Sequence, residues 1–204
     1  MYWTTPRKQR SATGENVDRL FSGGLCQNNH RCQVRRMNNM SQRRPIIGVM
    51  GAGENAAESA VRHAYTLGQL IAQEGWILLN GGRNCGVMDA SARGAKEAGG
   101  LTVGILPDAD LHQASAYVDI PILTGLGSGR NNINVLSSDV VIACRGGAGT
   151  LSEIALALKA EKPVILVDFA IGALFDPTER EYLMQVNTPA EAIELVKKLL
   201  KSNT

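Results

Sequence analysis

The chain has 204 residues, of which 44% are hydrophobic, and this is enough for one globular domain with an apolar core. No apolar run is long enough to cross a bilayer, so a helical membrane protein is excluded. The net charge is only +2, but residues 1–44 hold 9 Lys/Arg against 2 Asp/Glu, whereas residues 45–204 hold 12 against 17. The acidic second part argues against a folded nucleic-acid-binding domain.

Residues 1–44 are basic, polar and rich in Gly and Asn, which predicts a disordered N-terminal extension. The alternatives are a basic tail that contacts nucleic acid or anionic lipid, an Arg-rich transit peptide, or a start codon at Met40. The four cysteines, at positions 26, 32, 85 and 144, have no CxxC spacing. We therefore expect reduced thiols, a cytoplasmic protein and no protein-bound catalytic metal.

Continuous aliphatic runs alternate with helical patterns from residue 45 onward. The runs predict strands, some continuing into loops, in segments 45–53, 76–80, 101–107, 119–125, 140–150 and 163–168. Helical spacing occurs in segments 56–75, 87–100, 128–139, 151–162 and 188–200, and Thr188 with Glu191 gives the last helix a capping signature. This order predicts an α/β fold over residues 45–204: a Rossmann-like, doubly wound, mainly parallel sheet with helices on both faces.

Glycine clusters follow three of these strands. They lie after the first, second and fifth strands, at Gly51 and Gly53, Gly81 and Gly82, and Gly146 to Gly149. In parallel sheets of this kind, ligands bind beyond the carboxyl ends of the strands. We therefore expect the three loops to form one cleft.

The first two loops each allow two interpretations. The "GAG" of residues 51–53 is either a tight turn or a ligand wall; NAD binding is disfavoured because no acidic residue follows the second strand to hold a ribose hydroxyl. In "NGGRNCGVMD", residues 80–89, Gly81 and Gly82 allow close backbone approach. Arg83 or Asn84 could then reach an anion or a base edge. The alternative is a glycine-rich turn with solvated polar residues.

The third loop, "GGAGT" at residues 146–150, is the strongest anion signal, because backbone N–H groups and the Thr150 hydroxyl at a helix N-terminus suit a phosphate. No Lys follows the last glycine, so it is not a Walker loop. Glu153, in the first turn of the helix, either interacts favourably with the helix dipole or faces the sugar of the ligand. Arg130 is either a surface arginine or the cation that lies across the ligand from Glu153.

"GGRNCGVMD" and "GGAGTLSE" resemble, in this order, the paired glycine motifs of the "lonely guy" (LOG) and lysine-decarboxylase-like superfamily, the second of which is PGGxGTxxE. The resemblance covers about residues 45–167. It implies that the second motif binds the phosphate of a nucleoside 5′-monophosphate, and that Glu153 and Arg130 cleave its N-glycosidic bond. Nothing in the sequence marks a pyridoxal-phosphate lysine, so lysine decarboxylation has no support.

The chain departs from that motif at three positions, with Arg145 in place of the proline, Ala148 in place of a bulky residue, and Ser152 before Glu153. Residues 125–143, "GLGSGRNNINVLSSDVVIA", together with "GTLSEIALALK" more closely resemble the subgroup that contains molybdenum cofactor carrier proteins. This resemblance implies a bound phosphorylated pterin and a homo-oligomer, either a dimer or a tetramer. Ile154 and Leu158 then lie either in the core or in a subunit contact.

We therefore expect a carrier of a phosphorylated, nucleotide-like ligand, with the molybdenum cofactor as the leading ligand. One alternative is a phosphoribohydrolase acting on nucleoside monophosphates, with Arg130 and Glu153 as its catalytic residues; another is a nucleotide sensor. No membrane or nucleic-acid partner is expected for the folded domain. The candidate ligand-binding residues are Gly51, Gly53, Gly81, Gly82, Arg83, Asn84, Arg130, Asn131, Gly146, Gly147, Ala148, Gly149, Thr150 and Glu153.

Overall fold

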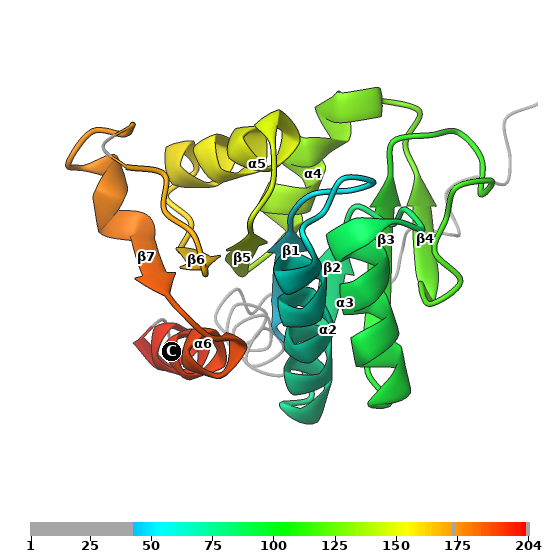
Figure 1. The fold of residues 1–204 in the computed structure, drawn as a ribbon, viewed down its shortest axis with the longest axis horizontal. Helices are drawn as coiled ribbons and strands as arrows, with labels where there is room; N and C mark the ends of the chain where they lie inside the picture. Colours follow the sequence, from blue (N-terminus) through cyan, green and yellow to red (C-terminus); the bar gives the residue numbers. More distant parts are fainter. Residues whose placement is uncertain (1–42, 173, 203–204) are drawn as a thin grey trace, which may run out of the picture. The chain divides into compact units, whose positions relative to one another are not determined.

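A seven-stranded parallel sheet forms the centre of the part of the chain that this computed structural model describes, residues 43–172 and 174–202 (Figure 1). Every strand pair in it is parallel, so the predicted Rossmann-like sheet is confirmed. The predicted disordered extension lies outside the described residues, apart from its last two positions. In spatial order the strands are β4 (Ile120–Leu123), β3 (Leu101–Leu106), β2 (Ile77–Asn80), β1 (Ile46–Met50), β5 (Val140–Cys144), β6 (Val164–Val167) and β7 (Leu183–Val186).

Helices cover both faces of the sheet, as predicted (Figure 1). The first face packs against α2 (Glu58–Gln73), α3 (Gly86–Glu97) and α6 (Pro189–Ser202), and the second against α4 (Asn131–Ser137) and α5 (Ala148–Lys159). Side chains of a strand point alternately to the two faces. Within β5, Ile142 therefore belongs to the first core cluster, and Val141 and Ala143 belong to the second. This double coverage explains why the strands read as unbroken aliphatic runs.

The order of the strands places the site. Strand β1 pairs with β2 on one side and with β5 on the other. Strands β2 to β4 extend the sheet in one direction and β5 to β7 extend it in the other, so the strand order reverses between β1 and β5. The loops that follow these strands consequently open at one edge of the sheet, at the switch point where ligands bind in such folds.

Several local features differ from the sequence-based expectation. Strand β7 was not predicted; it follows the short 3-10 helix η2 (Glu179–Tyr182) and is only partly buried, so its hydrophobic pattern is weak. Arg130 ends another 3-10 helix, η1 (Gly127–Arg130), immediately before α4. Helix α5 begins three residues earlier than predicted, at Ala148. The glycine loop therefore already forms the first turn of α5.

Ile154 and Leu158 are 1% and 2% exposed, respectively, and lie in the core of the chain itself. The predicted cap of α6 is present, because the Glu191 N–H donates to Thr188 Oγ1 at 3.3 Å. The described residues begin with two arginines that we placed in the extension; Arg43 pairs with Asp139, and Arg44 donates to a backbone carbonyl at the end of α2. None of the described helices is both long and apolar enough to span a membrane.

Candidate functional site

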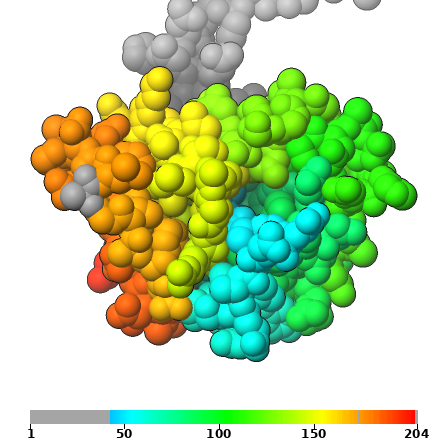
Figure 2. Space-filling model, turned by 45° about the horizontal axis from the view of Figure 1, so that its top comes forward, coloured from blue at the N-terminus to red at the C-terminus, as the bar shows by residue number. Residues whose placement is uncertain are grey.

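A cavity of about 500 Å³ lies at the carboxyl ends of β1, β2 and β5, where the three glycine loops meet. This volume is within the ordinary range for small-molecule sites. In the space-filling view the surface is hollowed beside the cyan segment that follows β1, between it and the green and yellow segments (Figure 2). The candidate residues that line this cavity are Gly51, Gly53, Gly81, Arg83, Arg130, Asn131, Gly147, Gly149, Thr150 and Glu153.

Four other candidates do not line the cavity: Gly82, Asn84, Gly146 and Ala148. Gly82 has φ +74° and lies against the backbone of Gly104 on the neighbouring strand, so it serves the packing of β2 on β3. The Asn84 N–H donates to the backbone of the β3–β4 loop. A Cβ at Gly146 would overlap the side chain of Thr150 and the backbone of Ala52. Gly82, Asn84 and Gly146 therefore contribute to the conformation and packing of the loops.

Gly147 and Gly149 differ from the other glycines of the site, because a Cβ at either position would meet no atom within 4 Å. Gly147 is the N-cap residue of α5, and Gly149 lies in its first turn. The N–H groups of a first turn have no partner within their helix, and they form the positive end of the helix dipole. The cavity therefore has an open, positively polarised wall at the start of α5, which suits an anionic group.

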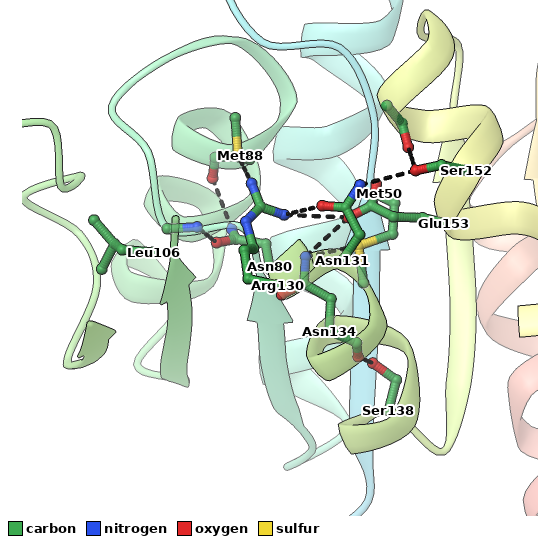
Figure 3. A network of polar contacts seen from close by, with 12 residues as sticks. Met50, Asn80, Met88, Leu106, Arg130, Asn131, Asn134, Ser138, Ser152 and Glu153 are labelled. Carbon is green, nitrogen blue, oxygen red and sulfur yellow. Dashed lines mark hydrogen bonds and ion pairs between the residues drawn. The ribbon is translucent and has the colours of Figure 1, made fainter. Parts of the chain in front are cut away.

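The side chains of α4 and α5 meet at Glu153 (Figure 3). Its Oε1 accepts from Asn134 Nδ2 at 2.8 Å and from Arg130 Nη1 at 3.3 Å. The Arg130 and Glu153 side chains are 11% and 7% exposed, so this is a buried ion pair. The same Arg130 nitrogen donates to Asn131, which in turn donates to Ser152. The pair is thus fixed by a continuous network at the cavity wall.

Burial raises the pKa of the Glu153 carboxyl above its usual range, although the bond from Asn134 and the charge of Arg130 oppose the rise. Burial also lowers the pKa of the Arg130 guanidinium, which the Glu153 carboxylate partly offsets. A carboxyl with a raised pKa and a cationic neighbour can act in proton transfer. It can equally serve as a fixed counter-ion for the arginine.

Gly81 provides the space that Arg130 occupies. A Cβ there would lie 2.5 Å from Arg130 Nη2 and 2.6 Å from Met88 Sδ. Gly81 is therefore needed to seat the arginine, whatever it does for a ligand. Arg83 lines the same cavity, but its guanidinium pairs with Asp108 at 3.1 Å, and both side chains are about one-third exposed. Its charge is partly neutralised from the β3–β4 loop.

Sequence reasoning did not select seven residues that line the cavity, Val49, Met50, Ala52, Glu54, Asn55, Cys85 and Met88, or two residues that hold its charged side chains, Asn134 and Asp108. Asn134, a partner of Glu153, lies one turn beyond Arg130 and so on the same side of the helix, a spacing that could have identified it. Asp108 had no local signal, because its partner Arg83 is 25 positions away. Within the described residues, no three His, Cys, Asp or Glu side chains are grouped so that they could hold a metal ion.

Two solved structures of molybdenum cofactor proteins are similar to this chain. It is 56% identical to the molybdenum cofactor binding protein of the phototrophic bacterium Rippkaea orientalis, with a TM-score of 0.75. It is 50% identical to the molybdenum cofactor carrier protein of Chlamydomonas reinhardtii, with a TM-score of 0.73. Both alignments cover 78% of this chain and 99% of the other.

A more distant relative is an enzyme. The chain is 34% identical, over 113 residues, to the cytokinin riboside 5′-monophosphate phosphoribohydrolase of Mycobacterium tuberculosis; the match covers 52% of this chain and 60% of the enzyme, less than two thirds of its length. These matches confirm the resemblances that the glycine motifs suggested. The model of the SLOG cluster4 family matches residues 44–193. The chain therefore belongs to the SLOG cluster4 family.

Proposed function

We propose that this protein is a cytoplasmic carrier that binds the molybdenum cofactor through its terminal phosphate. The proposal depends above all on the open wall at Gly147 and Gly149, which presents the start of α5 to a cavity of ligand size. The similarity to two molybdenum cofactor proteins, at 56% and 50% identity, supports this choice of ligand.

The residues of the cavity suit such a cargo. The first-turn N–H groups of α5 and the Thr150 hydroxyl would hold the phosphate. Arg130 would attract the anionic ligand, while Glu153 keeps the arginine oriented and limits its net charge. Gly51 and Gly53, which also line the cavity, would bound another side of the ligand. Binding and release would then need no covalent step.

Gly147→Asp tests the carrier function. We expect at least ~10-fold less cofactor to co-purify with this variant, because a carboxylate would occupy the phosphate position and repel it. Bound cofactor is measured as pterin fluorescence after oxidation and as molybdenum by mass spectrometry. Asn132→Asp, at an exposed position of α4 that does not line the cavity, is the charge-matched control. Equal cofactor content in both variants would contradict the proposed site.

A second candidate function is a phosphoribohydrolase. It is favoured by the buried Glu153 carboxyl, whose pKa is raised and which lies beside Arg130 at the cavity wall. The 34% identity to a phosphoribohydrolase gives it further support. If the protein is such an enzyme, it releases a free base from nucleoside 5′-monophosphates.

Glu153→Gln separates the two candidates. For an enzyme we expect base release, measured by chromatography, to fall by at least ~100-fold, because the amide cannot ionise or transfer a proton. For a carrier, the wild type releases no base at high protein concentration, and the variant retains cofactor within about a few-fold. Base release by the wild type that is lost in the variant would overturn the carrier proposal.

We also propose that the protein assembles into a homo-oligomer. Four large apolar side chains at the β4 end of the sheet are exposed: Ile120, Ile122, Leu123 and Leu126. An edge strand has unpaired backbone groups, and exposed apolar side chains beside it add apolar area. Together they favour association. The resemblance to carrier proteins that form homo-oligomers supports the same conclusion.

A further inference from the structure

A second cavity, of about 430 Å³, adjoins the first on the other side of the glycine loop. Gly147 and Thr150 line both cavities. The first cavity lies at the carboxyl ends of β1, β2 and β5, whereas the second lies between α5 and the segment that follows β6. The two cavities therefore flank the glycine loop that follows β5, and the start of α5 lies between them.

The second cavity has the lining of a site for a base and a sugar. Its apolar side chains come from α5 and from the segment after β6: Leu151, Ile154, Phe169 and Ile171. Its two charged residues are Arg145 and Asp168. The cavity thus combines apolar side chains with polar and charged groups, and an aromatic ring with aliphatic neighbours suits a heterocyclic base.

No acidic residue follows the second strand, but Asp168 provides one at the end of another strand. It directly follows β6, has φ +58°, and its side chain is 53% exposed. Its N–H donates to Val186 on β7, which fixes the position of the residue, and His63 Nδ1 lies 3.9 Å from its carboxylate. In dinucleotide-binding sheets, a carboxylate at a strand end accepts hydrogen bonds from the hydroxyls of a ribose. Here that carboxylate follows β6, on the other half of the sheet.

The glycine loop connects the two cavities in a way that suits a pyrophosphate. Gly147, whose missing side chain leaves open space, lines both of them. A terminal phosphate in the first cavity would therefore lie close to the second cavity. A further phosphate linked to it would remain within reach of the start of α5, and the nucleoside beyond it would lie in the second cavity.

We propose that the second cavity binds the nucleoside of a dinucleotide, so that the protein accepts its cargo extended by a nucleoside monophosphate through a pyrophosphate. This inference rests on the proposed function, because the pterin half occupies the first cavity. Asp168 accepts from the ribose hydroxyls, and the apolar side chains of the second cavity contact the base.

The test compares two defined ligands by equilibrium binding: the molybdenum cofactor with a terminal phosphate, and the same cofactor joined to GMP through a pyrophosphate. We expect the wild type to bind the extended ligand more tightly. In Asp168→Asn this preference falls roughly tenfold, while the affinity for the monophosphate form is unchanged. Asparagine retains the size of the side chain and tolerates the positive φ, so the variant is expected to fold.

Asp176→Asn is the control, because Asp176 is exposed on the same segment and does not line either cavity. It should retain the preference for the extended ligand. Equal affinity of the wild type for the two ligands, or an equal loss of both ligands in Asp168→Asn, would overturn the second site and leave the carrier proposal intact. Absence of binding for both ligands would overturn the proposed function, and the dinucleotide inference with it.

Discussion

In the buried pair of Arg130 and Glu153, each residue determines how much free energy the burial of the other charge costs. Each charge loses its hydration when the chain folds, and the other charge compensates for that loss. Removal of one member therefore leaves an unpaired buried charge, which is more costly than removal of both. The raised pKa of Glu153 indicates that its carboxylate remains under this burden even with Arg130 present.

Arg130→Met should lower the free energy of unfolding by about 3 kcal/mol at neutral pH, because it leaves the Glu153 carboxylate without its cation. The pKa of Glu153 in the folded state should then rise further above its value in the unfolded chain. The folded state binds more protons than the unfolded state between these two pKa values, so stability falls as pH rises. The loss should therefore shrink as pH is lowered towards the ordinary glutamate pKa of 4.5.

Urea unfolding at several pH values measures this dependence. Arg62→Met is the matched control, since Arg62 pairs with Glu58 on the exposed surface of α2. Such an exposed ion pair stabilises a protein by less than about 1 kcal/mol. The control should show no comparable dependence on pH. A loss for Arg130→Met that is the same at acidic and neutral pH would contradict the proposed charge burden on Glu153.

At the scale of elements, α2 and α3 pack unusually closely because each presents a glycine to the other. A Cβ at Gly68 would overlap the carbonyl oxygen of Ser91, and a Cβ at Gly94 would overlap that of Tyr65. The two helices cover β1 and β2, which end at the first cavity. Their spacing therefore helps to position the first two glycine loops.

Gly68→Ala should destabilise the protein by about 1–3 kcal/mol, although alanine favours an isolated helix by about 1 kcal/mol. The reason is that the new Cβ meets backbone atoms of α3, which cannot move aside like a side chain. Gly149→Ala, in the first turn of α5 with open space around it, is the matched control and should be neutral or stabilising. Thermal unfolding of both variants measures the difference; equal Tm values would show that the helix contact is less close than described.

At the scale of the whole molecule, the described unit has exposed apolar residues at the β4 edge of its sheet. Ile122→Lys should therefore reduce the mass of the particle in sedimentation equilibrium, because the lysine would place a charge in the proposed subunit contact. Leu174→Lys, at an exposed position after β6, is the control and should leave the mass unchanged. A wild type that sediments as a monomer, or an unchanged mass for Ile122→Lys, would contradict the proposed oligomer.

The sequence by itself determined the fold class and the three glycine loops. Unbroken aliphatic strands require cover on both faces, and loops after parallel strands must open at one edge. The sequence also predicted Arg130 and Glu153 as site residues, through the resemblance and their place around the glycine motif, and both line the first cavity. Strand β7 was missed because a half-buried edge strand has a weak pattern.

Only the tertiary structure decided what each glycine does. Gly81 seats Arg130 and Gly82 packs on the next strand, whereas Gly147 and Gly149 border open space, yet all four look alike in the sequence. The pairing of Arg83 with Asp108 and the second cavity beside Asp168 were likewise invisible, because they join segments far apart in the chain. The physical reason is that local patterns report backbone preference and burial, while the space beside a residue depends on what the rest of the chain places there.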